Sequence, residues 1–144
     1  MRLCRTISMA MLIIMGFTSQ SVLADDKRGN PFIGLWQGID LEDGATHLRS
    51  IRRNKDGTFS LVGNTTYFTL CGGTNRGLIT GTGTVENGVL EAKETVTCFN
   101  DGRTIEGLET EYVLDRENGT LTEQRKFGVP EPLIFHVISP RPEY

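Results

Sequence analysis

The sequence predicts an all-β domain: an antiparallel up-and-down meander barrel of eight or nine strands with one disulfide. Three observations lead to this fold class. Short segments rich in Val, Ile, Thr, Phe and Tyr recur along the chain, dipeptides that favour positive φ separate them, and no segment after residue 24 has the period and length of a helix. A two-sheet sandwich is the alternative, but an uninterrupted series of short hairpins favours a meander, and closure removes exposed strand edges.

The first 24 residues are expected to be a secretory signal peptide. Arg2 and Arg5 precede an apolar run, and Val22 and Ala24 are spaced like a small-residue cleavage site. The apolar run is shorter than the roughly 20 residues of a membrane span. We therefore expect a secreted or periplasmic protein, cleaved after Ala24, with no membrane span.

A single barrel domain is expected over residues 32–139, between a flexible N-terminal arm at 25–31 and a C-terminal tail at 140–144. Turn dipeptides divide this domain. They are Asp43-Gly44, Asp56-Gly57, Gly63-Asn64, Asn87-Gly88, Asp101-Gly102 and Asn118-Gly119. The strands that they separate are expected at 32–41, 46–53, 58–62, 65–70, 78–85, 89–98, 104–115, 120–127 and 133–138.

Cysteine usage predicts one disulfide. Cys4 lies in the leader, so the exported chain keeps Cys71 and Cys98, and an even count in an exported domain favours their pairing. In the chain-entropy account such a loop contributes about 3 to 4 kcal/mol. The chain has no C-x-x-C and two histidines far apart, so a metal pair is disfavoured and no cofactor is expected.

Composition and motifs argue against nucleic-acid binding and against catalysis. The formal net charge is −3, which gives no electrostatic basis for binding a polyanion. One basic cluster, at Arg49, Arg52, Arg53 and Lys55, is expected on a solvated hairpin face. The sequence contains no G-x-S-x-G, no H-E-x-x-H and no phosphate-binding glycine loop, so we do not expect an enzyme.

Two glycines at alternate positions of a predicted strand indicate which residues face the interior. A two-residue type I′ turn at Asn87-Gly88 places Gly81 opposite Glu94 and Gly83 opposite Ala92. The other face of this hairpin carries threonines and charged residues, so we expect that face to be exposed to solvent. The glycines therefore point inward, in front of an inward-facing carboxylate.

The same alternation places further polar side chains inside the barrel. A three-residue turn at 100–102 keeps Leu108, Thr110, Tyr112 and Leu114 inside. A two-residue turn at Asn118-Gly119 then turns 121, 123, 125 and 127 inward and sets Arg125 opposite Tyr112. The predicted lumen thus contains Glu94, Tyr112, Glu123 and Arg125.

Two interpretations of this lumen remain open. In one, Arg125 pairs with Glu123 or Glu94, Tyr112 donates into the pair, and the glycines allow the sheet to coil. In the other, Gly81, Gly83 and Ala92 keep a cavity open, and the polar groups bind one end of a small molecule. Glycoside hydrolysis by the two glutamates is conceivable, but nothing in the sequence sets their separation.

The first strand contains a motif with a known counterpart. Gly34-Leu35-Trp36 resembles the Gly-x-Trp signature of lipocalins and related calycin barrels, although their Thr-Asp-Tyr motif is absent. The resemblance implies an eight-stranded cup that binds an apolar or amphipathic ligand, with Trp36 across its closed end, facing Ile51 and Leu61. We therefore expect a non-catalytic protein that binds a small ligand in its lumen, with Trp36 among the lining residues.

A protein partner is the alternative. Small exported barrels with one disulfide also resemble periplasmic inhibitors of proteases or lysozymes, which insert a loop or an arm into the cleft of an enzyme. The connection from Cys71 to Gly77 would be tethered by the disulfide, with Arg76 near its tip. The arm at 25–31 is the other segment that could bind such a partner.

Overall fold

The computed structural model describes residues 30–126 and 131–140. The predicted signal peptide, residues 25–29 of the predicted arm, and the inward-facing position 127 lie outside the described residues. So does the predicted tail beyond Pro140. Within the part of the chain that is described, no helix is long and apolar enough to cross a membrane.

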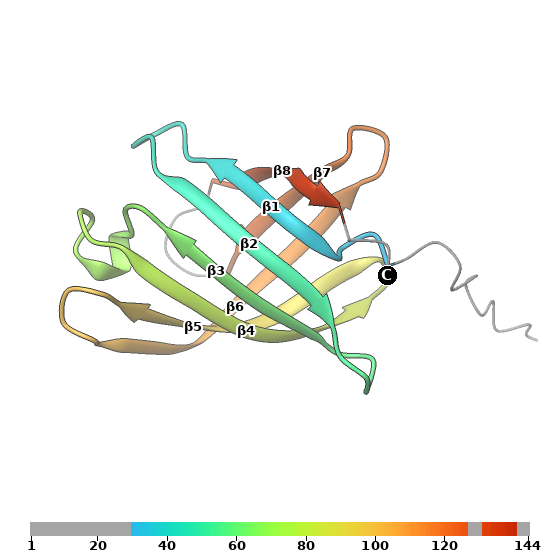
Figure 1. The fold of residues 1–144 in the computed structure, drawn as a ribbon, viewed down its shortest axis with the longest axis horizontal. Coiled ribbons are helices and arrows are strands. Elements are labelled where there is room, and N and C mark those ends of the chain that lie inside the picture. The colour runs from blue at the N-terminus through green and yellow to red at the C-terminus, as the bar shows by residue number, and fades with distance from the viewer. Residues whose placement is uncertain (1–29, 127–130, 141–144) are drawn as a thin grey trace, which may run out of the picture.

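The described residues form a closed antiparallel barrel in which each strand pairs with the next and β1 pairs with β8 (Figure 1). This confirms the predicted meander barrel. A short 3-10 turn, η1 (Thr69–Cys71), lies between β3 and β4. The strands are β1 (Gly34–Ile39), β2 (Thr46–Arg53), β3 (Phe59–Thr65), β4 (Gly77–Glu86), β5 (Val89–Cys98), β6 (Thr104–Asp115), β7 (Thr120–Arg125) and β8 (Leu133–Pro140).

The two ends of the barrel differ. One, the loop end, carries the connections 40–45, 66–76 and 99–103, and the predicted disulfide between Cys71 and Cys98 closes there. The other, the turn end, carries 54–58, 87–88 and 116–119. One apolar cluster extends from the turn end and a second lies beneath the disulfide. The first contains Phe32, Trp36, Ile51, Phe59, Leu61, Leu90, Ala92, Tyr112, Leu121, Leu133 and Phe135, and the second Phe68, Cys71, Ile79, Val96 and Cys98.

The β4–β5 hairpin has the predicted register. Gly81 pairs with Glu94 and Gly83 with Ala92, across a turn in which Asn87 has φ 51° and Gly88 φ 83°. Positive φ at both positions is the type I′ geometry that fits the twist of antiparallel strands. The strand faces were therefore predictable here from local turn chemistry.

The predicted turn at Gly63-Asn64 and the predicted strand at 65–70 are wrong, because β3 runs without a break through Gly63. Gly63 pairs with Arg49 of β2. A Cβ atom at Gly63 would lie 2.9 Å from Cδ of Arg49 and would overlap the carbonyl oxygen of Leu48. The glycine thus makes room for a long side chain beside it rather than turning the chain.

Two predicted turn lengths are also wrong, although the predicted faces are right. The β5–β6 connection has five residues, 99–103, and a bulge sets Glu106 and Gly107 against Thr95. The β6–β7 connection has four residues, 116–119, and the Asp115 carboxylate accepts hydrogen bonds from backbone N–H groups within it. Because the β6–β7 connection is two residues longer than predicted, each side chain keeps its predicted face. Each residue of β6, however, pairs with the residue of β7 two positions before the predicted one.

The shift changes one predicted pair. Glu123, rather than Arg125, lies opposite Tyr112, and Arg125 lies opposite Thr110. Side chains on a strand alternate between faces with period two, so the residues predicted to face inward still do so.

Replacing Gly63 with alanine should destabilise the barrel by about 2 kcal/mol, because the added methyl group would crowd the Leu48 carbonyl and the Arg49 side chain. Urea unfolding measures this loss. Gly44→Asn is a control, since Gly44 has φ 73° and open space around it, and asparagine tolerates that conformation. Equal stability of Gly63→Ala and the parent protein would contradict the packing argument.

Candidate functional site

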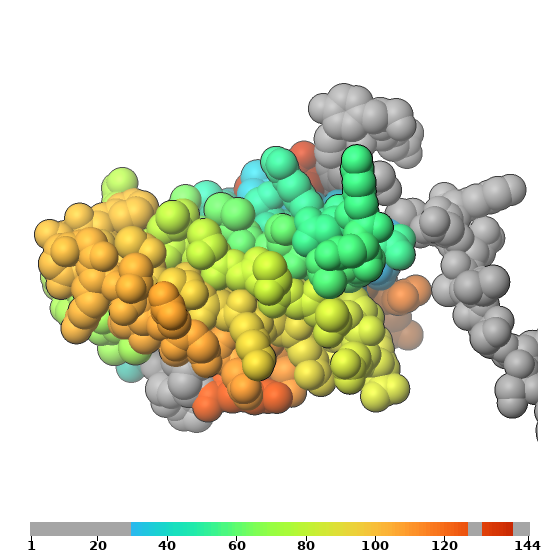
Figure 2. Space-filling model, turned by 90° about the horizontal axis from the view of Figure 1, so that it is seen from below, coloured from blue at the N-terminus to red at the C-terminus, as the bar shows by residue number. Residues whose placement is uncertain are grey.

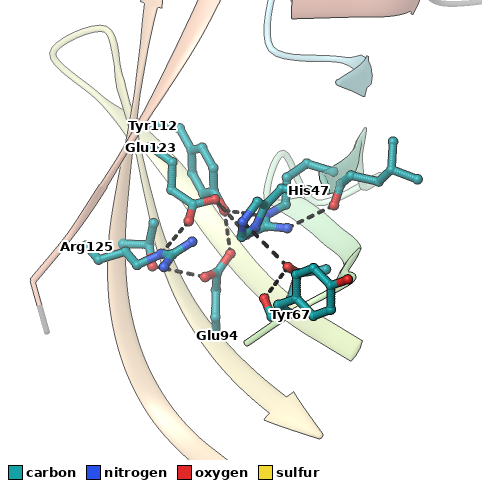
Figure 3. A network of polar contacts seen from close by, with 10 residues as sticks. His47, Tyr67, Glu94, Tyr112, Glu123 and Arg125 are labelled. Carbon is teal, nitrogen blue, oxygen red and sulfur yellow. Dashed lines mark hydrogen bonds and ion pairs between the residues drawn. The ribbon is translucent and has the colours of Figure 1, made fainter. Parts of the chain in front are cut away.

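A polar network occupies the middle of the barrel, between the two apolar clusters (Figure 3). Its members come from the three consecutive strands β5, β6 and β7 and from the distant strand β2, and the inward parity of each strand brings them together. They are Arg49 of β2, Glu94 of β5, Thr110 and Tyr112 of β6, and Glu123 and Arg125 of β7.

Tyr112 joins the two carboxylates of the network. Its hydroxyl oxygen lies 2.6 Å from Oε1 of Glu94 and 3.1 Å from Oε2 of Glu123. Thr110 donates a hydrogen bond of 2.9 Å to the other oxygen of Glu94. These side chains are buried, so the contacts form in a region of low dielectric, where they are strong.

Glu123 is held between two arginines. Its Oε2 lies 2.8 Å from Nη2 of Arg49, and its Oε1 accepts a hydrogen bond of 2.6 Å from Nε of Arg125. Arg125 also lies over the ring of Phe68, with its guanidinium carbon 5.6 Å from the ring centroid. Of the ion pairs that the sequence allowed for Arg125, the structure thus forms the one with Glu123.

Arg49 was not predicted to belong to this site. The sequence placed it in a solvated basic cluster, and this is wrong, because its side chain is 0% exposed. Its Nε donates to the Tyr112 hydroxyl at 3.2 Å, and its guanidinium lies 5.4 Å from the ring centroid of Phe135. One signal was present: Arg49 shares the strand face of Ile51, whose apolar side chain has to point inward.

The electrostatics of the network follow from burial and from these contacts. Burial alone would raise the pKa of Glu123, but Arg49 and Arg125 outweigh it and hold that pKa at about 2. Burial raises the pKa of Glu94, and the negative charge of Glu123 adds to this effect. Burial also raises the pKa of Tyr112 well above its ordinary value. Two carboxyl groups joined by one hydroxyl thus differ sharply in acidity.

His47 lies beside the network on β2. It is buried, and its Nε2 is 3.5 Å from the hydroxyl of Thr65. Burial, together with the positive charge of Arg49, lowers the pKa of His47 to about 4. The imidazole is therefore neutral at pH 7.

The space beside the two predicted cavity glycines is filled by the protein itself. A Cβ atom at Gly81 would lie 2.9 Å from Cγ of Glu94, and one at Gly83 would lie 3.0 Å from Cδ1 of Leu90. Both would also crowd carbonyl oxygens of β5. These glycines let β4 approach β5 and leave room for a buried carboxyl side chain.

Trp36 lies apart from the polar network. Its ring is buried in the apolar cluster that also contains the two residues it was expected to face, Ile51 and Leu61. Its indole N–H donates a hydrogen bond of 2.9 Å to the carbonyl of Phe32. In the structure Trp36 is thus a core residue with its polar group satisfied.

A pocket of about 140 Å³ opens at the loop end, where Arg125 reaches the surface. The Arg125 side chain is 16% exposed, so the network meets solvent at this place. Apolar and acidic residues surround the guanidinium. The pocket is lined by Ile39, Asp40, Leu41, Glu42, Arg125, Glu131, Pro132, Leu133 and Ile134.

A second hollow, of about 290 Å³, lies across β4, β5 and β6, whose outer face is turned toward the viewer in Figure 2. Its lining combines small residues with threonines and charged side chains. It contains Thr58, Thr82, Gly83, Thr84, Glu91, Ala92, Lys93, Glu109, Thr110 and Lys126. Lys126 is already paired with Glu111, their charged atoms being 2.7 Å apart.

The connection from Cys71 to Gly77 is held in place at several points. The Cys71–Cys98 disulfide anchors one end, and the Asn75 amide donates to the Cys71 carbonyl at 2.9 Å. The N–H of Phe99 donates to the Arg76 carbonyl. Arg76 is exposed, and Phe99 beside it is 59% exposed.

Removing the Tyr112 hydroxyl should destabilise the fold by about 2 kcal/mol, because Tyr112→Phe leaves buried oxygens of two carboxyl groups without this hydrogen bond. Urea unfolding at neutral pH tests this. Tyr67→Phe is the matched control, since Tyr67 is 46% exposed and its loss should cost less than about 0.5 kcal/mol. If both variants are equally stable, the network contributes nothing.

Acidification should destabilise the protein through His47. Its pKa is 6.5 when unfolded and about 4 when folded, so the unfolded state binds more protons as the pH falls from 6.5 to 4. His47→Asn should remove this loss, so the stability difference between parent and variant should shrink over that range. The free energy of unfolding of the parent protein and of His47→Asn is measured at several pH values, with His136→Asn, at an exposed position, as the control. A stability difference between the parent protein and His47→Asn that stays constant from pH 6.5 to 4 would contradict this prediction.

Comparisons with known proteins identify no relative. The chain matches no protein-family model, and neither the curated proteins nor the solved structures contain a match to it. The likeness to lipocalins therefore rests on Gly34-Leu35-Trp36 and on the barrel architecture alone, and it stays an expectation. Function has to be argued from the chemistry of the site.

Proposed function

We propose that this is a secreted or periplasmic, non-catalytic binding protein for a small apolar or amphipathic ligand, held at the loop end of the barrel. The pocket beside Arg125 carries the proposal, because there apolar walls and a partly free guanidinium meet in one concave place. Small-molecule sites combine apolar walls with polar groups that orient the ligand, and here five apolar and four charged residues line the pocket. The Cys71–Cys98 disulfide supports export, since such bonds persist in oxidising compartments.

The size of the pocket limits the ligand. Its volume of about 140 Å³ is close to that of cavities, on the order of 150 Å³, that hold one benzene molecule in proteins. Leu133 and Ile134 form part of the apolar wall, and Ile39 and Leu41 extend that surface outward. A ligand with a short apolar part and one polar end suits this arrangement.

The predicted lumen residues take an indirect part in this proposal. Glu94, Tyr112 and Glu123 are buried and bind one another. Glu123 fixes the Nε edge of Arg125, which leaves the Nη edge of the guanidinium for other contacts. The network thus positions the one member that lines the pocket. Enclosure of both carboxyl groups supports a non-catalytic role.

A second candidate function is the binding of a partner protein through the 71–77 connection. The observation that favours it is the exposed pair of Arg76 and Phe99, which lie on two neighbouring connections joined by the Cys71–Cys98 disulfide and by the Phe99 N–H to Arg76 carbonyl hydrogen bond. Arginine and aromatic residues are frequent anchors in interfaces, and a rigid loop loses little entropy on binding.

Native mass spectrometry of the protein, exported by its own leader, tests the first proposal. We expect additional mass that the folded form retains and the denatured form loses. Ile134→Glu should abolish this mass, because a carboxylate would enter the apolar wall of the pocket.

Ile138→Glu provides the matched control. Ile138 lies on the same strand, β8, and Ile138 and Ile134 are 51% and 52% exposed, but Ile138 does not line the pocket. It should keep the bound mass. Identical behaviour of the two variants would contradict the pocket as the binding site. A folded form that binds no small molecule, together with loss of a partner protein by the Arg76→Ala, Phe99→Ala double variant, would favour the second candidate.

A further inference from the structure

The short contacts around Tyr112 bear on where a buried proton of the network resides. A tyrosine hydroxyl has one proton, yet its oxygen lies within 3.1 Å of oxygens from both Glu94 and Glu123 and accepts the Nε–H of Arg49. That one proton can occupy only one of the two contacts between the hydroxyl and the carboxyl oxygens. If Glu94 is protonated, it donates to Tyr112 and Tyr112 donates to Glu123, and each contact then has its proton.

This assignment agrees with the surroundings of Glu94. The groups that face it are Tyr112 and Thr110 from β6, Glu123 from β7, Arg49 from β2, and the bare backbone of Gly81 on β4. Burial and the charge of Glu123 raise the pKa of Glu94, whereas the two arginines already surround Glu123. The shared proton therefore belongs on Glu94.

A protonated Glu94 leaves the network with one positive charge in excess. Among the described side chains of the network, Arg49 and Arg125 are cations and Glu123 is then the single anion, while His47 is neutral at pH 7. Arg49 is fully enclosed. Arg125 is therefore the cation of the network that reaches solvent, in the pocket of the loop end, where Asp40, Glu42 and Glu131 lie around it.

We propose that this pocket is a site for a monocarboxylate with a short apolar chain, whose carboxylate binds the Nη edge of Arg125. The inference rests on the proposed function and names its ligand class. The planar fork of a guanidinium matches a carboxylate, and Glu123 occupies only its Nε edge. The chain would lie against Ile39, Leu133 and Ile134.

The acidic residues of the same pocket restrict the charge of the ligand. Asp40, Glu42 and Glu131 line it, and Asp40 is held in position by accepting the backbone N–H of Glu42 at 2.9 Å. These carboxylates repel any anion, and the repulsion is about twice as large for a dianion as for a monoanion, while Arg125 can form one bidentate contact. A monoanion is therefore preferred to a dianion such as a phosphate monoester.

Titration of the unaltered protein with hexanoate, 1-hexanol, hexylamine and hexyl phosphate tests this inference, with binding followed by the NMR signals of Leu133 and Ile134. Hexanoate should bind at least about tenfold more tightly than the other three probes. Arg125→Gln should lower hexanoate affinity about tenfold and leave 1-hexanol affinity unchanged. Arg116→Gln, which removes an exposed charge at the turn end, should change neither.

The outcomes separate this inference from the function on which it rests. If 1-hexanol, hexylamine or hexyl phosphate binds as tightly as hexanoate, the monocarboxylate class is wrong, but a binding pocket remains. If no probe moves the signals of Leu133 and Ile134, the pocket and the proposed function both fail.

The proton on Glu94 has a test of its own that needs no ligand. Infrared spectra of the parent protein at neutral pH should contain the carbonyl band of a buried protonated carboxyl group, and Glu94→Gln should lose it. A parent spectrum without this band, or a band that persists in the variant, would overturn the charge count.

Discussion

The ionised carboxylate of Glu123, enclosed in the middle of a small barrel, is the constraint on which the rest of the structure depends. Removing such a group from water costs several kcal/mol unless well-placed partners replace the water. Those partners come from β2, β6 and β7: Arg49, Tyr112 and Arg125. In an open sheet β2 and β7 would lie far apart. Closure through the pairing of β1 with β8 brings them face to face, so the network and the closed barrel require each other.

Long polar side chains need room inside an eight-stranded barrel, and glycines on neighbouring strands supply it. Gly63 lies opposite Arg49, and Gly81 lies opposite Glu94. At both positions a methyl group would approach the long side chain within 2.9 Å. Glycine at inward positions of these strands therefore indicates where a large side chain of the neighbouring strand is buried. It does not indicate an empty cavity.

The fold class, the disulfide and the β4–β5 register could be predicted because they depend on local signals: alternation with period two, the Asn87-Gly88 turn, and an even number of cysteines. Loop lengths could not, because the same dipeptides also occur within longer connections, whose lengths depend on hydrogen bonds such as those of Asp115. Inward parity survived the wrong lengths, so Glu94, Tyr112 and Glu123 were correctly brought together. Arg49 was missed because its burial depends on a distant carboxylate, and local sequence favours a solvated face for a basic cluster.

Pairing of the first strand with the last makes the barrel a ring in which the order of strands matters more than where the ring is cut. Gly34 lies beside Pro140, so the outer ends of β1 and β8 are neighbours in space. A short linker could join them, and new ends could be opened at the exposed Asn87-Gly88 turn without losing a strand pair. Such a circular permutant would keep every contact of the buried network but change the sequence distance between its members. Comparing the folding rates of the permutant and the parent protein would therefore separate the effect of chain connectivity from the effect of the native contacts.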